Sequence, residues 1–308
     1  FRDERYPSEG DTDDAKNGLL DDAGKKVPFI DRIVIREIVE SQPVWLKFMR
    51  GDLDVSGIPK DNYSQAIGEG KTLRPEMAAK GIALTKLIEP ATYYVGFNME
   101  DPVVGRGPGA REIRYAIQLA MNIEREIDLI MNGRGTRAWG PIPPGFDAFR
   151  EGGARNPRAR FDLRAARAYV NEAIKKRGGP IPKLRLDFGN TSTTTRQIAE
   201  MYVADLRSVG IEVEPIFNSW PKFLERTKTK TAQFFDLGWI ADYPDSENFL
   251  QLFYGPNKSP GANNANYDNP DFNRLYEEIR VMRDSPERTR TYIRMEDIVI
   301  ADAPWAFS

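Results

Sequence analysis

The stretch LRLDFGNTSTTTRQIAEMYVADLRSVGIEVEPIF, residues 184 to 217, predicts a strand, a helix and a second strand in succession. LRLDFG (184–189) and IEVEPIF (211–217) are runs of strand length. Residues 194–208 lie between them and carry apolar side chains at helical spacing, namely Ile198, Met201, Tyr202 and Leu206. A strand–helix–strand unit of this kind is typical of an α/β sheet.

The same alternation continues on both sides of this unit. Asp162 is placed to cap a helix that runs to about residue 177, residues 219–227 predict a further helix, and AQFFDLGWI (232–240) predicts a strand. We therefore expect an α/β fold with a mixed sheet and helices on its faces.

The flanking regions add further elements to this pattern. YYVGFNM (93–99) predicts a strand, and residues 111–122 and 123–133 predict two helices. Two more helices begin at Asn269–Pro270 and Ser285–Pro286, where an N-cap residue precedes a proline.

Residues 1–28 are polar and predict a surface loop. Three segments that follow have patterns of half-buried strands: IDRIVIREIV (30–39), DLDVSGI (52–58) and IALTKLIE (82–89). The polar opening and the apolar PWAFS at the other end suggest a part of a longer protein.

Composition limits the possible functions. The 308 residues suffice for two domains, and their net charge of −2 creates no field that attracts nucleic acid or an anionic membrane. The chain has no Cys and no His, which excludes thiol nucleophiles, disulfides, and His-based triads and metal sites. An enzyme would depend on carboxylates, Lys, Tyr, Ser or Thr alone. Glycosidases show that this is possible, because they need only two carboxylates.

The segment GWIADYPDSENF (238–249) is the strongest candidate for a binding site. It lies at the carboxyl end of a predicted strand, where open α/β sheets bind ligands. Asp242 offers a fixed charge for an ammonium group, Trp239 offers a flat apolar surface, and the strand's own backbone can pair with an extended ligand. The alternative is structural: Asp242 caps the turn and Trp239 fills the core.

Other interpretations of the same residues remain open. Asp242, Asp245 and Glu247 form an acidic cluster, but a calcium loop needs more ligands and a glycine at a set position. Two of these carboxylates could instead serve a hydrolase. Trp220 begins a predicted helix, where core packing is the default and pocket lining is the alternative.

An ordered set of segments resembles the family 5 extracellular solute-binding proteins, the peptide- and oligopeptide-binding proteins of ABC importers. The matching segments are IDRIVIREIVE, FMRGDLDVSGIP, TYYVGFNM, REIRYAIQLAMNIEREIDLIMNGRG, WGPIPPG, VGIEVEPIFNSWPKFLE, FDLGWIADYPDSENFLQLFYG and ANYDNPDFNRLYEEIR. Together they extend over nearly all of residues 30–308, so the set is specific although no single motif decides it.

The resemblance implies a two-lobed, periplasmic-binding-protein-like fold (type II, peptide-binding cluster), incomplete at both ends. Residues 1–91 would form part of the first lobe and residues 92–308 the second. The chain would cross between the lobes near residues 90–93 and again after residue 304.

The resemblance also implies a site and a role. Asp242 matches the acidic residue that holds the peptide's α-ammonium in such proteins, and the strand at Gly238 and Ile240 would pair with the peptide backbone. Trp220 would line a side-chain pocket, and the expected ligand-binding set is completed by Trp239, Tyr93 and Tyr94. No arginine stands where dipeptide-specific members hold the ligand carboxylate, which favours longer peptides.

The implied protein is a periplasmic or otherwise extracytoplasmic monomer that captures an extended oligopeptide and delivers it to an ABC permease in the membrane. It would be no enzyme, and would use no cofactor, metal or nucleic acid. Two alternatives remain: an oligosaccharide-binding protein of the same family, and a carboxylate-dependent hydrolase.

Overall fold

The computed structural model describes residues 10–152 and 156–308. The chain divides into two compact units, residues 1–39 and 40–308. The described part of the first unit holds one helix, α1 (Thr12–Lys16), whose N-cap Asp11 accepts hydrogen bonds from the N–H groups of Asp13 and Asp14. The division into lobes at residues 91 and 92 stays a prediction.

The three strands expected near the N-terminus are not formed. Residues 30–39, 52–58 and 82–89 run without strand pairing, and many of their apolar side chains are exposed, as Ile35 is at 90% and Leu87 at 86%. The apolar pattern of these segments is that of a strand, but a strand needs a hydrogen-bonded neighbour, and the described residues offer them none.

The second unit opens with short helices around a small apolar cluster of Trp45, Ala66 and Ile67. Its helices are α2 (Ser41–Met49), α3 (Tyr63–Ala66) and α4 (Pro75–Ala78), with 3₁₀ turns at Lys60–Asn62 and Glu69–Lys71. Arg134, from a distant loop, donates a hydrogen bond to the Ile58 carbonyl at 3.0 Å and lies over the Tyr63 ring.

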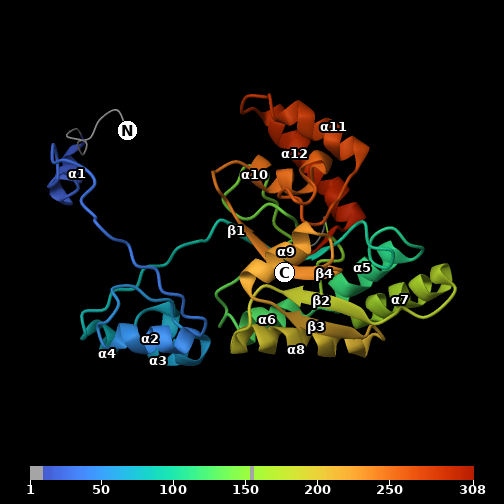
Figure 1. Ribbon diagram of the computed structural model, residues 1–308, viewed down its shortest axis with the longest axis horizontal. Coiled ribbons are helices and arrows are strands. Elements are labelled where there is room, and N and C mark those ends of the chain that lie inside the picture. The colour runs from blue at the N-terminus through green and yellow to red at the C-terminus, as the bar shows by residue number, and fades with distance from the viewer. Residues whose placement is uncertain (1–9, 153–155) are drawn as a thin grey trace. The chain divides into compact units, whose positions relative to one another are not determined.

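The described residues contain one mixed sheet of five strands, in the order β3-β2-β4-β1-β5 (Figure 1). The strands are β1 (Ala91–Phe97), β2 (Leu184–Phe188), β3 (Val213–Phe217), β4 (Phe234–Ile240) and β5 (Trp305–Phe307). β2 pairs in parallel with β3 and β4, whereas β1 pairs antiparallel with β4 and β5. The predicted strands at 93–99, 184–189, 211–217 and 232–240 are therefore confirmed to within two residues at each end.

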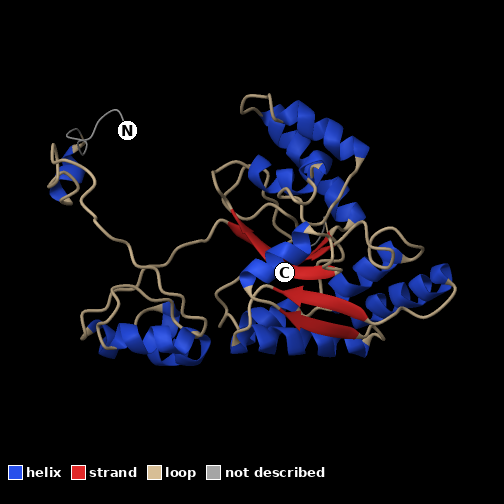
Figure 2. Ribbon diagram, in the orientation of Figure 1, coloured by secondary structure: helices blue, strands red, loops and turns tan. Residues whose placement is uncertain are grey.

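Helices cover both faces of the sheet (Figure 2). One face, here called the α8 face, carries Val95, Phe97 and Phe234 and packs against the first group of helices. These are α5 (Ala110–Ala120), α6 (Ile123–Leu129), α7 (Leu163–Arg177) and α8 (Thr193–Ser208).

The opposite face, here called the α12 face, carries Tyr94 and Phe235 and packs against the second group. These are α9 (Trp220–Lys228), α10 (Glu247–Leu250), α11 (Pro270–Ile279) and α12 (Pro286–Asp302), with 3₁₀ turns at Gln251–Phe253 and Gly255–Asn257.

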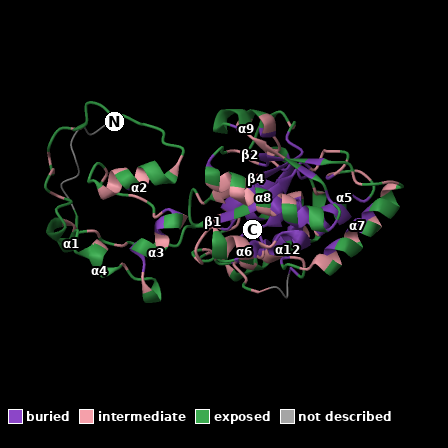
Figure 3. Cartoon of the chain, turned by 90° about the horizontal axis from the view of Figure 1, so that it is seen from below, coloured by how far each residue is buried: buried purple, intermediate pink, exposed green. Residues whose placement is uncertain are grey.

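The buried residues gather around this sheet (Figure 3). Each large apolar side chain withdrawn from water there contributes about 1.5 to 3 kcal/mol. The helices begin where their caps predict: Asp162 accepts from the Ala165 N–H at 2.9 Å, and Asn269 and Ser285 cap α11 and α12. The sheet is thus a rigid frame, and β4 lies at its centre.

Candidate functional site: the free edge of strand β4

Strand β4 is paired on both sides over only part of its length. β1 accompanies it from Phe234 to Ile240, whereas β2 accompanies it only from Phe234 to Asp236 and ends at Phe188. Beyond Asp236, no strand of the described residues lies beside the side of β4 that faces β2. We call this part, at Gly238 and Ile240, the free edge.

The hydrogen-bond pattern fixes the direction of the backbone groups at the free edge. The Ala241 N–H donates to the Pro90 carbonyl at 2.8 Å, on the β1 side. Backbone groups of successive residues in a strand point to alternate sides, so the N–H and C=O of Gly238 and Ile240 point away from β1. They are therefore available to pair with an extended chain.

The ring of Tyr93 covers Gly238 on the α8 face. A Cβ at residue 238 would lie 2.6 Å from Tyr93 Cδ1, so the close approach requires glycine. Tyr93 is 47% exposed, and its hydroxyl donates to Glu89 at 3.0 Å. Burial and this hydrogen bond raise the pKa of Tyr93 to about 12, so the phenol stays neutral and serves as a donor and an apolar surface.

Tyr94 lies on the other face of the sheet. Alternation along β1 turns it away from Tyr93, and it is 1% exposed, with its ring stacked on Trp305 in the core. Although Tyr94 belonged to the expected ligand-binding set, the structure places its side chain out of reach of a ligand at the free edge.

Trp239 and Asp242 are both held by Asn248. The Asn248 Oδ1 atom accepts from the indole N–H of Trp239 at 2.8 Å and from the backbone N–H of Asp242 at 3.1 Å. Trp239 is partly buried against the α12-face core, so the structural interpretation holds for its indole. Asp242 is exposed, and its Oδ2 atom accepts from Asn248 Nδ2 at 3.3 Å. The carboxylate is thereby oriented at the end of the free edge, still open to solvent.

The two other acids of the predicted cluster are engaged elsewhere. Asp245 accepts from Arg288 and from the Tyr292 hydroxyl, each at 2.7 Å, and Glu247 accepts from the hydroxyls of Tyr243 and Tyr276. Burial acts to raise the pKa of Asp245, but the hydrogen bonds outweigh it and the pKa is lowered. Asp242, Asp245 and Glu247 therefore serve different contacts and form no joint carboxylate pair.

Trp220 lies where β2 ends. It begins α9, is 51% exposed, and stacks on Phe223 with ring centroids 5.5 Å apart. A Cβ at Gly189, the residue after β2, would lie 2.9 Å from the Trp220 ring. The tryptophan thus presents an exposed aromatic surface beside the point where the free edge begins.

Two residues of this region were not singled out from the sequence. Asn248 carries no recognisable signal, because an asparagine eight positions after a strand is unremarkable until the fold brings its side chain against Trp239 and Asp242. Asp236 does carry one, since it is the one charged residue inside the apolar run AQFFDLGWI. It lies on β4 two residues before Gly238 and on the same face of the sheet.

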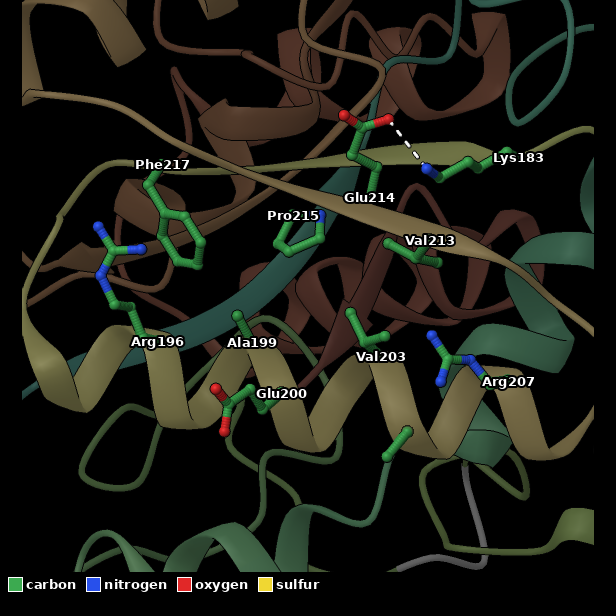
Figure 4. A pocket seen from close by; sticks show the side chains of 11 residues that line it. Lys183, Arg196, Ala199, Glu200, Val203, Arg207, Val213, Glu214, Pro215 and Phe217 are labelled. Carbon is green, nitrogen blue, oxygen red and sulfur yellow. Dashed lines mark ion pairs between the residues drawn. The ribbon is translucent and has the colours of Figure 1, made fainter.

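Two of the hollows among the described residues of the second unit lie away from the free edge. One, of about 460 Å³, separates α8 from the edge strand β3, with Arg196, Glu200 and Arg207 at its rim (Figure 4). Pro215 lies in the middle of that strand and has no N–H to offer a ligand backbone. The other, of about 930 Å³, is mainly apolar and is lined by residues 45–88 with Arg134. Neither contains the predicted site residues.

Comparison with known proteins agrees with the fold. The family model described as "Bacterial extracellular solute-binding proteins, family 5 Middle" matches residues 14–261. The chain belongs to this family. It is 26% identical over 271 residues to the oligopeptide-binding protein OppA of Bacillus subtilis, a match that covers 84% of this chain and 46% of the relative. It is 23% identical to heme-binding protein A of Haemophilus influenzae, which it matches over 90% of its own length and 48% of the relative's.

Solved structures share the fold. DppA of Helicobacter pylori, in complex with the peptide STSA, superimposes with a TM-score of 0.74 at 22% identity over 93% of this chain and 52% of that one. AppA of Bacillus subtilis, in complex with a nonapeptide, gives 0.73 at 17% identity over 88% and 52%. The chain thus spans about half the length of the relatives it matches. Among the described residues, no helix has the length and apolar character to cross a membrane.

Proposed function

We propose that the protein containing this chain is an extracytoplasmic solute-binding protein that captures extended oligopeptides and delivers them to an ABC permease. The observation that carries the proposal is the free edge of β4, whose unpaired backbone at Gly238 and Ile240 leads to the exposed carboxylate of Asp242. Membership in a family of solute-binding proteins supports the same role.

The binding mode follows from these groups. A peptide lying along the free edge would exchange main-chain hydrogen bonds with Gly238 and Ile240 and place its α-ammonium at Asp242. Trp220 and Tyr93 would contact side chains without demanding a particular one. Main-chain pairing and a charged terminus are common to all peptides, so such a site recognises the backbone first.

The wider mechanism rests on the two-lobed arrangement inferred from the sequence. In it, the lobes close around the peptide by rotation about the crossing segments near residues 90–93, and the closed monomer docks on the permease. The location would be the periplasm, or the outer face of the membrane in a Gram-positive cell. A soluble peptide is the ligand in this scheme, and no chemical step is needed.

Titration calorimetry on the full-length protein tests the proposal. A charge-assisted hydrogen bond contributes about 1.5 to 3 kcal/mol, so Asp242→Asn should weaken the binding of peptides roughly tenfold or more. Asp61→Asn, which changes a carboxylate whose side chain is 77% exposed and which lies outside the site, is the matched control and should bind as the wild type does. Unchanged affinity in Asp242→Asn rejects the role assigned to this residue.

Two further experiments separate the alternatives. Cello- or xylo-oligosaccharides that raise the melting temperature where peptides do not would favour sugar binding, with Trp220 as the stacking surface. Mass spectrometry of the ligand after long incubation distinguishes binding from hydrolysis. We expect the peptide to be recovered intact, because Asp245 and Glu247 are held by α11 and α12 away from Asp242.

A further inference from the structure

Asp236 is a carboxylate on the strand that forms the proposed site. It pairs in register with Val95 of β1 and Phe188 of β2, at the last position where β4 has a strand on both sides. Alternation places its side chain on the α8 face together with Gly238, on the side of Tyr93. It therefore lies at the inner end of the free edge, as Asp242 lies at the outer end.

Among the described residues, no positively charged group offsets the charge of Asp236. In the described part of the chain, no ion pair or hydrogen bond involves its side chain. The charge that acts on it comes from Glu126 of α6, another carboxylate, which accepts a hydrogen bond from the Tyr202 hydroxyl of α8 at 2.6 Å. Burial, and then Glu126, raise the pKa of Asp236 to about 7.

Arg137, an arginine paired with α6, is already engaged through its Nε by another group. Arg137 donates through Nε to Glu124 at 3.0 Å, and burial lowers its pKa. Tyr93 of β1 lies on the same face as Asp236, as a neutral phenol whose own pKa is raised in part by the charge of Asp236. Asp236 is thus a half-buried anion whose neighbours on β1, α6 and α8 are acids or phenols.

Such a group gains more from an incoming cation than an exposed carboxylate does. A half-buried charge has lost part of its hydration, and a like charge beside it adds to the cost, so a ligand ammonium or guanidinium offsets both. A ligand carboxylate at the same place would be repelled. The chemistry of the inner end therefore favours a basic side chain and disfavours a free C-terminus.

The spacing suits a peptide with two positive groups. Asp236 and Asp242 are six positions apart, which corresponds to at most about 20 Å. A peptide lying along the free edge with its α-ammonium at Asp242 would reach Asp236 with the long side chain of about its fourth to sixth residue.

We propose that Asp236, reinforced by Glu126, makes this site selective for oligopeptides that carry Lys or Arg at the position facing the inner end of the free edge. This inference rests on the proposed function, in which the free edge holds an extended peptide. It adds a ligand class, namely basic peptides of at least about four residues.

The test uses the full-length protein and a set of alanine hexapeptides in which Lys occupies the third to the sixth position in turn. Norleucine, which has a neutral side chain of similar shape, replaces Lys in the matched set, and Glu replaces it in a third set. Calorimetry should find one position at which the Lys peptide binds at least tenfold more tightly than the norleucine peptide, and at which the Glu peptide binds most weakly.

Substitutions assign the preference to the residue. Asp236→Asn should bring the Lys and norleucine peptides to within twofold of each other, Asp236→Glu should retain the preference, and Glu126→Gln should reduce it. Asp242→Asn should weaken both peptides equally and leave their ratio unchanged. Binding of the norleucine peptide to each variant confirms that it is folded.

The outcomes are distinguishable from a failure of the proposed function. Equal affinity for Lys, norleucine and Glu peptides at every position would overturn the inference and leave peptide binding intact. A preference for Lys that survives in Asp236→Asn would also overturn it. If no peptide binds the wild type, the proposed function itself fails.

Discussion

The ring of Tyr93 lies directly on the α-carbon of Gly238, so closely that a Cβ at residue 238 would be 2.6 Å from Tyr93 Cδ1. This contact joins β1 to β4 at the free edge. It also fixes the position of an exposed aromatic ring beside the backbone groups proposed to bind the ligand.

Gly238→Ala should therefore destabilise the chain by about 1 to 3 kcal/mol, because the ring must move or the strands must separate. Adding Tyr93→Ala should restore part of the loss. Urea unfolding followed by circular dichroism measures both. Gly179→Ala is the control, since a Cβ there meets nothing within 4 Å. Equal stability of Gly238→Ala and the wild type would contradict the packing described.

Asn248 provides a second test of the site. Asn248→Ala removes the acceptor shared by the Trp239 indole and the Asp242 backbone, and each unsatisfied buried donor costs about 1 to 3 kcal/mol. We expect weaker peptide binding and a changed tryptophan emission spectrum. Asn171→Ala, on an exposed position of α7, should alter neither. Unchanged binding would mean that Asn248 does not position Asp242.

Arg114 joins α5 to the end of α12. The guanidinium is buried and donates to the carbonyls of Val104 at 2.7 Å, Asp302 at 2.7 Å and Ala303 at 2.9 Å. Arg114→Met should lower the free energy of unfolding by about 3 to 5 kcal/mol, because several buried carbonyls lose their donor. Arg111→Met, one turn away with a side chain 58% exposed, should cost less than 1 kcal/mol in the same melt.

The dependence of stability on pH has a defined sign. Burial is the main cause that raises the pKa of both Asp236 and Glu296 to about 7, from ordinary values near 4. A carboxyl group with a raised pKa in the folded state favours folding when protonated. Its contribution is complete below its ordinary pKa and is lost as the pH rises through about 7.

Stability should therefore fall between about pH 4.5 and pH 8. Asp236→Asn should be more stable than the wild type at pH 8, by on the order of 2 kcal/mol, and similar at pH 4. The groups that face Asp236 are Glu126, Tyr202 and Tyr93, and none of them supplies a positive charge. Thermal melts across this range measure the effect, and an identical pH profile for both proteins would contradict it.

Pro215 protects the outer edge of the sheet. The Leu184 N–H donates to the Glu212 carbonyl and the Asn218 N–H to Phe188, so alternation turns Pro215 outward on the edge strand. Pro215→Val would restore an edge donor, and we expect increased self-association in sedimentation velocity. Pro180→Val, at an exposed site outside the strands, is the control.

The strands of the sheet were predicted correctly where the neighbouring strand is part of the same strand–helix–strand pattern. Residues 184–189, 211–217 and 232–240 alternate with helices, and such units determine their own neighbours. The segments at 30–39, 52–58 and 82–89 show the limit, because a strand-like pattern gives the apolar face of a strand but not the neighbour that would pair with it.

The candidate site was predictable in part for the same reason. The position of Asp242 at the end of an apolar strand could be inferred from local pattern, and the structure leaves it exposed there. Its contact with Asn248 and the proximity of Asp236 to Glu126 depend on folding, which brings together residues from β4, α6, α10 and the loop before α10. Tyr94 was wrongly expected at the site. It is adjacent to Tyr93 in the strand, and adjacent residues of a strand face opposite sides of the sheet.

The incomplete pairing of β4 has a consequence for recognition. Three of its residues are fixed by neighbours on both sides, and the next four continue the same backbone with one side open. A ligand that docks there extends a sheet whose twist and spacing are already set by the interior of the protein. Little ordering of the receptor remains to be done at the moment of capture, so most of the entropic cost of binding falls on the ligand.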